Sequence, residues 1–160
     1  MRYLAVFILL GTLNVVHRTD SAPPKTQVLS LWNLGQVGEC VLHYFPLVYN
    51  DYGCWCGFGG AHTPIDEIDN CCMHHDHCYD AAVKSKACYD FIWEYVDTYS
   101  WKCSNSTPYC SATNHPCQSA LCACDVAVTK CWSKYPKPHG KRKCTHKRES
   151  LESILKQYLL

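Results

Sequence analysis

The chain has 160 residues, the size of one domain with a modest core and too few for two. Its fourteen cysteines are typical of disulfide scaffolds in oxidising compartments and argue against a reduced cytosolic protein. The formal net charge of +1 indicates no polyanionic partner for the chain as a whole, and we expect no nucleic-acid binding.

The N-terminal residues read as a secretory signal. Met1 and Arg2 precede an apolar run over residues 3–13, and more mixed sequence continues to Ala22. That run is too short to span a bilayer permanently. We therefore expect a signal peptide over 1–22, a short pro-segment over 23–29, a domain over 30–144 and a C-terminal extension over 145–160, in a secreted, extracellular protein.

Residues 51–60 form a glycine-rich loop, with four glycines in the eight positions from Gly53 to Gly60. Glycine lets the backbone turn sharply and aim carbonyl oxygens at one point, and calcium prefers hard oxygen ligands of this kind. Cys54 and Cys56 would pin the loop. A calcium site here lacks only a carboxylate, while the alternative is a plain turn of a small secreted domain.

Two long helices are expected. Pro64 and the acids that follow it favour a helix start, which predicts a helix over about 66–84. A second helix, over about 116–134, carries apolar residues at three- and four-residue steps along one face. Each helix has two cysteines seven residues apart, so antiparallel packing would pair Cys71 with Cys131 and Cys78 with Cys124.

The first of these helices carries His75 and Asp76. Neighbouring helical residues point about 100° apart, so the two side chains must serve different partners. Asp76 would supply the carboxylate of the glycine loop. His75 would face Asp125 on the second helix, whose carboxylate would accept the Nδ1 proton and leave Nε2 free to take a proton from water.

A zinc site is a weaker alternative for the same stretch. His74 and His77 have i, i+3 spacing, but cysteines in an oxidising setting are better explained as disulfides, so we expect both histidines at the surface. The sequence has no Gly-x-Ser-x-Gly motif, which disfavours a serine hydrolase.

The remaining segments carry weaker signals. Residues 99–116 are expected to form a short hairpin, in which Asn105-Ser106-Thr107 is a possible glycosylation sequon. Residues 130–148 contain eight bases and no acid, which predicts a basic C-terminal face. Such a face is most often plain solvated surface, and otherwise a patch for anionic membranes or heparin. The tail after residue 144 is either an amphipathic membrane contact or a loosely ordered end.

Taken together, residues 30–144 resemble a secreted phospholipase A2 of the group that includes the pancreatic and elapid-venom enzymes. The resemblance rests on the glycine loop from Tyr52 to Gly60, the sequence Cys-Cys-Met-His-His-Asp-His-Cys-Tyr over 71–79, and Cys-Ala-Cys-Asp over 122–125. It implies a mainly α, disulfide-rich fold with an N-terminal helix, a calcium-binding loop, a small β-hairpin and two long antiparallel helices cross-linked by disulfides.

The resemblance also implies seven disulfides. They would join Cys40 to Cys103, Cys54 to Cys144, Cys56 to Cys72, Cys71 to Cys131, Cys78 to Cys124, Cys88 to Cys117, and Cys110 to Cys122. The first of these is characteristic of the pancreatic and elapid group.

The implied activity is calcium-dependent hydrolysis of the sn-2 ester of glycerophospholipids, giving a lysophospholipid and a fatty acid. Ca2+ would be held by the carbonyls of Trp55, Gly57 and Gly59 and by Asp76, with the Gly57 amide stabilising the oxyanion. His75 would activate water, Asp125 would orient it, and Tyr79 and Tyr99 would hold Asp125. The partner would be a phospholipid membrane surface or micelle, with a cell-surface receptor possible, and the protein is expected to be a monomer.

Two features bear on these expectations. Gly35 and Gly38 lie in the segment that forms the N-terminal helix of the family, where each would cost up to about 1 kcal/mol, so we expect a frayed helix and weakened interfacial activation. The alternative function is a catalytically silent receptor ligand or toxin on the same fold. Silent relatives often lose the calcium carboxylate, and Asp76 is present here.

Overall fold

The computed structural model describes residues 29–90 and 97–146. In chain order they form α1 (Leu29–Leu42), the 3-10 helix η1 (Pro46–Tyr49), α2 (Glu67–Lys84), β1 (Trp101–Ser104), β2 (Thr107–Cys110) and α4 (Pro116–Trp132). The mainly helical, disulfide-rich architecture is the one expected from the sequence. None of the helices in these ranges is both long and apolar enough to cross a membrane. The expected signal peptide (1–22) and most of the pro-segment and C-terminal extension lie outside the described residues.

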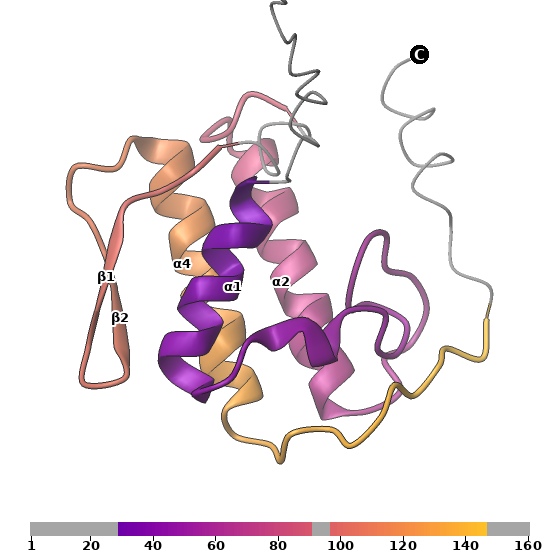
Figure 1. The fold of residues 1–160 in the computed structure, drawn as a ribbon. Helices are drawn as coiled ribbons and strands as arrows, with labels where there is room; N and C mark the ends of the chain where they lie inside the picture. The colour runs from indigo at the N-terminus through magenta and orange to yellow at the C-terminus, as the bar shows by residue number, and fades with distance from the viewer. Residues whose placement is uncertain (1–28, 91–96, 147–160) are drawn as a thin grey trace, which may run out of the picture.

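The two long helices α2 and α4 lie side by side and antiparallel (Figure 1). Asp66 begins α2 by accepting a hydrogen bond from the amide of Asp69, so the helix starts one residue later than expected. His115 begins α4 through a capping box with Gln118. Two disulfides, Cys71–Cys131 and Cys78–Cys124, fix the register between the helices.

The N-terminal helix is continuous from Leu29 to Leu42, so the expected fraying is wrong. A Cβ on Gly35 would lie 2.3 Å from the ring of Phe45, and one on Gly38 would lie 2.7 Å from Pro46. Both glycines therefore let the chain that follows α1 fold back closely against it. The packing that the missing side chains allow offsets their low helix propensity.

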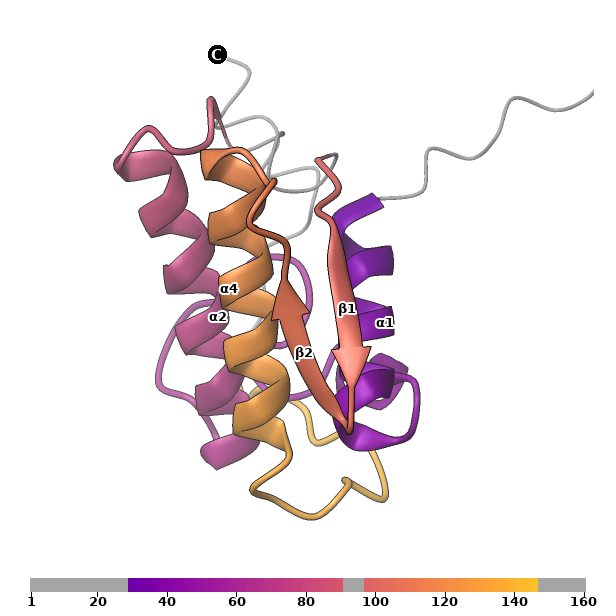
Figure 2. The ribbon, with the colours of Figure 1, turned by 90° about the vertical axis from the view of Figure 1, so that its left-hand side faces the viewer.

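A two-stranded antiparallel hairpin packs beside α1 and α4 (Figure 2). Trp101 is paired with Cys110 and Ser104 with Thr107. Asn105 and Ser106 form the turn, both with positive φ, as two-residue hairpin turns require. Cys40–Cys103 ties the hairpin to α1, and Cys110–Cys122 ties it to α4.

The core has two parts along the α2–α4 pair. One gathers Val37, Tyr79, Tyr99 and Leu121 between α1, α2 and α4. The other gathers Tyr49, Tyr52, Ile68 and Trp132 under the glycine loop, where the rings of Tyr49 and Trp132 stack at 4.1 Å. The candidate catalytic side chains come from α2 and α4, whose register is fixed by the two disulfides.

Candidate active site

The side chains of α2 divide between two partners. Cys71, His75 and Cys78 have i, i+4, i+7 spacing and so share the face that meets α4. Their bridges to Cys131 and Cys124 show that this face contacts α4 directly. Asp125 follows Cys124, and His75 is therefore held against it between the two disulfides.

The imidazole of His75 and the carboxylate of Asp125 form the central contact. Nε2 of His75 lies 2.7 Å from Oδ1 of Asp125, which is fully buried, while the His75 side chain keeps 12% of its surface exposed. An ionised carboxylate only accepts hydrogen bonds, so Nε2 carries the proton and Nδ1 presents the lone pair. The sequence predicts the reverse, and that prediction is wrong: the ring nitrogen farthest from the His75 backbone is the one that meets Asp125 on α4.

Both oxygens of Asp125 receive further hydrogen bonds. The Tyr79 hydroxyl donates to Oδ1 at 2.8 Å, and the Tyr99 hydroxyl donates to Oδ2 at 2.5 Å. Burial, and then the charge of Asp125 and the hydrogen bond to it, raise the pKa of Tyr99 well above the usual tyrosine value. Tyr99 therefore remains a donor across the physiological range, and the carboxylate is held in one orientation for His75.

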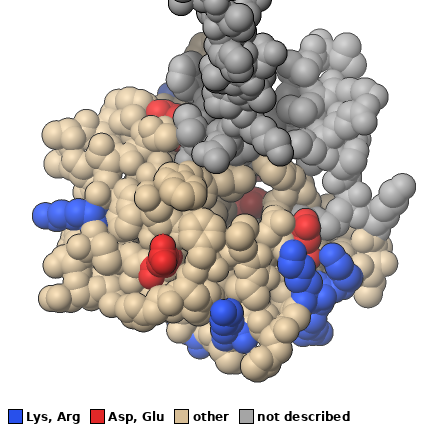
Figure 3. Space-filling view, in the orientation of Figure 1, with Lys and Arg blue, Asp and Glu red and all other residues tan. Residues whose placement is uncertain are grey.

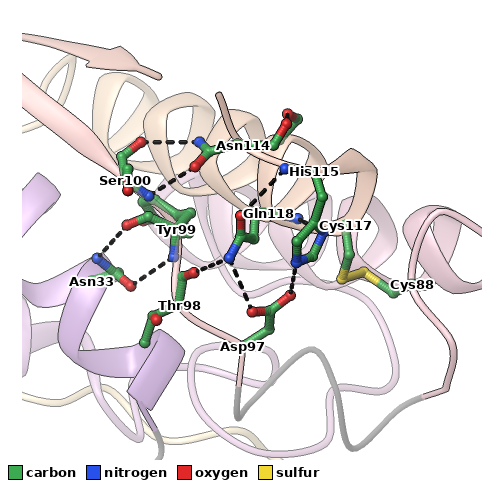
Figure 4. A network of polar contacts seen from close by, with 11 residues as sticks. Asn33, Cys88, Asp97, Thr98, Tyr99, Ser100, Asn114, His115, Cys117 and Gln118 are labelled. Atoms are coloured by element: carbon green, nitrogen blue, oxygen red, sulfur yellow. Dashed lines mark hydrogen bonds and ion pairs between the residues drawn. A yellow bond between two sulfur atoms is a disulfide. The ribbon is translucent and has the colours of Figure 1, made fainter. Parts of the chain in front are cut away.

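Tyr99 is itself clamped from both sides (Figure 4). The side chain of Asn33 on α1 donates to its carbonyl and accepts from its amide, both at 3.2 Å. On the α4 side, Gln118 donates to the carbonyl of Thr98 at 2.7 Å, and Asn114 makes two 2.9 Å bonds with the backbone of Ser100. The segment that carries Tyr99 is thus fixed to two helices by its backbone.

The same network includes a contact between His115 and Asp97 at the start of α4. Nε2 of His115 lies 3.1 Å from Oδ2 of Asp97, and the side-chain amide of Gln118 donates to Oδ1 of Asp97 at 3.3 Å. Figure 4 shows these side chains converging beside the Cys88–Cys117 disulfide. Gln118 therefore belongs both to the N-terminal cap of α4 and to the hydrogen bonds that hold the segment of Tyr99.

The glycine loop is organised by Asp69, a fully buried carboxylate on the first turn of α2. Its Oδ2 accepts from the amides of Cys54 and Ile65 at 2.8 and 2.9 Å, and its Oδ1 accepts from the amide of Trp55 at 2.7 Å. Gly53 has φ of 62°, and a Cβ there would lie 2.2 Å from this carboxylate. Only glycine lets the loop approach Asp69 so closely.

The residues expected to bind calcium come next along the loop. Gly57 and Gly59 also have positive φ, of 118° and 66°. The Cys56 amide donates back to the Tyr52 carbonyl, and since N–H and C=O of one peptide point in opposite directions, the Trp55 carbonyl faces away from that turn. Among the candidate ligands, the orientation of the Trp55 carbonyl is therefore fixed by this turn.

Asp76 lies on the side of α2 that meets this loop. Cys72 and Asp76 are four residues apart and share a helix face, and Cys72 is bridged to Cys56 in the loop. Among the described residues no three His, Cys, Asp or Glu side chains come together in a way that could hold a metal. A cation here would take most of its ligands from backbone carbonyls, and a set of carbonyls with one carboxylate suits calcium.

The other candidate residues lie at the surface. His74 and His77 are both exposed on α2, and the ring of His77 packs edge-on against Trp55. Asn105 is exposed at the hairpin turn. The seven disulfides of the structure join the same cysteines as those implied by the resemblance.

Sequence reasoning missed Asp69, Asn33 and Gln118. In the sequence Asp69 is one of the acids that favour a helix start, and its place three residues after the N-cap of a helix that follows a glycine-rich loop is a usable signal for a buried carboxylate. Asn33 is 66 residues from Tyr99, and no local pattern connects them.

Comparison with known proteins agrees with this geometry. Residues 31–145 match the family described as Phospholipase A2. The chain is 39% identical over 134 residues to the phospholipase A2 of Oryctolagus cuniculus, covering 81% of this chain and 90% of the relative. It is also 39% identical over 110 residues to the phospholipase A2 of Bos taurus, covering 67% of this chain and 76% of the relative. The chain belongs to the phospholipase A2 family.

Proposed function

We propose that this protein is a secreted, calcium-dependent phospholipase A2 that hydrolyses the sn-2 ester of glycerophospholipids and releases a lysophospholipid and a fatty acid. The observation that carries the proposal is the 2.7 Å contact between His75 Nε2 and the buried Asp125. Family membership supports the phospholipid substrate.

His75 acts as general base. With Nε2–H donated to Asp125, Nδ1 accepts a proton from a water molecule as the oxygen attacks the ester carbonyl, and it returns that proton to the leaving alkoxide. Asp125 stabilises the imidazolium formed in between, without taking its proton. Tyr79 and Tyr99 keep the carboxylate from rotating and so keep the ring in place.

Calcium would be held by the carbonyls of Trp55, Gly57 and Gly59 together with the Asp76 carboxylate. When bound, it would polarise the ester carbonyl as a Lewis acid and stabilise the negative charge of the tetrahedral intermediate. The Gly57 amide would donate to the same oxygen. Asp69 supports this arrangement from behind, because it accepts the amides of Cys54 and Trp55 and so fixes the backbone that leads into the Trp55 carbonyl.

A lipid surface would be met by the apolar side chains of α1 and the segment that follows it. The large exposed apolar residues there are Leu31, Trp32, Phe45 and Leu47, of which Leu47 is 67% exposed and Trp32 54%. Exposed apolar patches of this kind mark interaction surfaces. The unfrayed α1 keeps them in a fixed arrangement, so interfacial activation would be retained.

The same proposal extends to processing. Residues 1–22 would be removed as a signal peptide, 23–29 as a short pro-segment, and the active domain would span 30–144. The Cys40–Cys103 bridge supports the pancreatic and elapid group, and Asn105 on the exposed turn would be accessible to glycosylation. We expect the enzyme to work as a monomer at the membrane surface.

The test is release of fatty acid from phosphatidylcholine vesicles labelled at sn-1 or sn-2, with calcium or with a chelator. The wild type should release only the sn-2 acid and only with calcium. His75→Gln should lower the rate by about 100-fold to 10,000-fold, the range of general base catalysis. His74→Gln, on the neighbouring exposed residue, should leave it unchanged. Hydrolysis by His75→Gln at the wild-type rate would refute the mechanism, and an inactive wild type would refute the function.

A further inference from the structure

The two ends of α4 differ in their charge. Basic side chains gather at and after its C-terminal end, and Figure 3 shows Lys and Arg at the bottom and lower right, where Figure 1 places that segment. The N-terminal end, at the top of Figure 1, carries the hydrogen bonds of Gln118. With 17 residues α4 is about 25 Å long, roughly three times the Debye length at physiological salt. The basic residues therefore have little influence on the contacts of Gln118.

Gln118, half-buried in the first turn of α4, uses its whole side-chain amide. Nε2 donates to the Thr98 carbonyl at 2.7 Å and to Oδ1 of Asp97 at 3.3 Å, and Oε1 accepts from the backbone amide of His115 at 3.2 Å. An amide offers two N–H groups and an acceptor oxygen, and here each of these groups has a partner. Reversing the amide would place its oxygen against two acceptors, so the side chain has one favourable orientation.

Gln118 and Asp125 lie seven residues apart on α4. Seven residues make two helical turns, so the two side chains share one face at an axial distance of about 10.5 Å. Gln118 holds the Thr98 carbonyl, and the Tyr99 hydroxyl donates to Oδ2 of Asp125 at 2.5 Å. One helix therefore fixes both the peptide that leads into Tyr99 and the carboxylate that its hydroxyl meets.

The other hydrogen bonds to this segment come from outside α4. Asn33 belongs to α1, and Asn114, which bonds to the backbone of Ser100, precedes the first residue of α4. A shift of α1 relative to α4 would move Asn33 but would leave the distance between Gln118 and Asp125 unchanged. Gln118 is therefore the contact that fixes the segment of Tyr99 relative to Asp125.

We propose that Gln118 is a positioning residue for the hydrolysis: by holding the Thr98 carbonyl it places the Tyr99 hydroxyl on Asp125, and so steadies the carboxylate that orients His75. This inference rests on the function proposed above. The hydrogen bonds of Gln118 within the described residues reach neither His75 nor Asp125, so its effect on the reaction passes through Tyr99. Its loss should lower kcat and leave KM unchanged.

The test variant, Gln118→Glu, separates the two roles of this side chain. Glu keeps the acceptor oxygen of the capping box, in which it serves as well as Gln, but it has no N–H group for Thr98 or Asp97. The variant should therefore fold. The control, Ala123→Glu, adds the same charge at an exposed position of the same helix. Hydrolysis of a short-chain phosphatidylcholine below its critical micelle concentration, with calcium, gives kcat and KM separately.

Gln118→Glu should lower kcat by about three- to tenfold with KM within about twofold, and Ala123→Glu should change neither. In a Tyr99→Phe background Gln118→Glu should cost less than about twofold, because the hydroxyl through which Gln118 acts is absent. A purely structural role for Gln118 predicts equal fractional losses in the two backgrounds. Equal losses, or an unchanged kcat, would overturn the proposal.

A second measurement does not depend on activity. The proton NMR resonance of the Tyr99 hydroxyl, identified by its absence in Tyr99→Phe, reports the hydrogen bond to Asp125. It should shift in Gln118→Glu and stay in place in Ala123→Glu. If the wild type is inactive but the resonance shifts, the proposed hydrolysis is refuted while the hold of Gln118 on Tyr99 is supported. An active wild type whose resonance does not respond to Gln118→Glu would overturn the positioning role.

Discussion

Replacing Asp69 by Asn tests the view that one buried carboxylate organises the candidate calcium loop. The substitution hardly changes the shape of the side chain but exchanges one oxygen for an NH2 group. Oδ2 accepts two amides, those of Cys54 and Ile65, whereas Oδ1 accepts only that of Trp55. The variant should therefore keep its oxygen at the Oδ2 position and turn its NH2 group against the Trp55 amide.

The expected cost follows from these three bonds. A hydrogen bond to a charged group contributes about 1.5–3 kcal/mol, and the two bonds that remain weaken because their acceptor becomes neutral. We expect the free energy of unfolding to fall by about 2–4 kcal/mol. Calcium affinity should fall as well, because the displaced Trp55 peptide lies next to a carbonyl proposed as a ligand.

Guanidinium unfolding with a chelator, disulfides intact, measures the stability, and calorimetric titration measures calcium binding. Asp80→Asn is the control: Asp80 is on the same helix but half-exposed, and its 3.5 Å pair with Lys84 should be worth no more than about 0.5 kcal/mol. If Asp69→Asn unfolds within about 0.5 kcal/mol of the wild type and binds calcium equally well, Asp69 does not organise the loop.

Three further predictions concern the support of the site and the packing of α1. Tyr99→Phe removes one of the two tyrosine donors to Asp125, and we expect the hydrolysis rate to fall several-fold. The double variant with Tyr79→Phe should lose more activity than the two single variants combined, which a kinetic double-mutant cycle measures. Gly35→Ala should destabilise the protein by about 1–3 kcal/mol because its Cβ meets Phe45, although propensity alone predicts a gain of about 1 kcal/mol. Gly140→Ala, which meets nothing within 4 Å, should be neutral in the same unfolding assay, and a stabilised Gly35→Ala would contradict the packing argument. Burial raises the pKa of Tyr49, Tyr52 and Tyr99, so the folded state holds their protons more tightly, and stability should fall as pH rises above about 10, less steeply in Tyr99→Phe.

The parts of the site that depend on helix periodicity could be predicted from the sequence. Seven-residue spacing of cysteines on two amphipathic segments places His75 opposite Asp125, because the helical repeat alone determines which side chains share a face. The glycine loop could be predicted because its glycines permit turns that other residues disfavour and its cysteines tie it to the rest of the chain. In both cases the signal lies within a few residues of the feature.

The features that the sequence predicted wrongly, or did not predict, depend on contacts between distant segments. Which nitrogen of His75 meets Asp125 depends on the distance between two helices, and the spacing of residues does not give that distance. Gly35 and Gly38 looked like defects because propensity describes an isolated helix, whereas Phe45 and Pro46 close onto them only in the folded chain. The Asn33–Tyr99 contact joins the N-terminal helix to the segment before the hairpin, and no local sequence pattern predicts it.

The equal spacing of the cysteines on α2 and α4 has a consequence for oxidative folding. If the antiparallel helices slipped by two turns in one direction, Cys78 could bridge to Cys131, but Cys71 would have no cysteine opposite it on α4. A slip in the other direction would place Cys71 opposite Cys124 and Cys78 opposite Cys117, leaving Cys88 and Cys131 without their native partners. Only the native register closes the three bridges Cys71–Cys131, Cys78–Cys124 and Cys88–Cys117 together. During thiol–disulfide exchange the slipped forms retain free thiols that can attack their own wrong bridge, so the same pair of helices that aligns His75 with Asp125 also corrects its own misalignment.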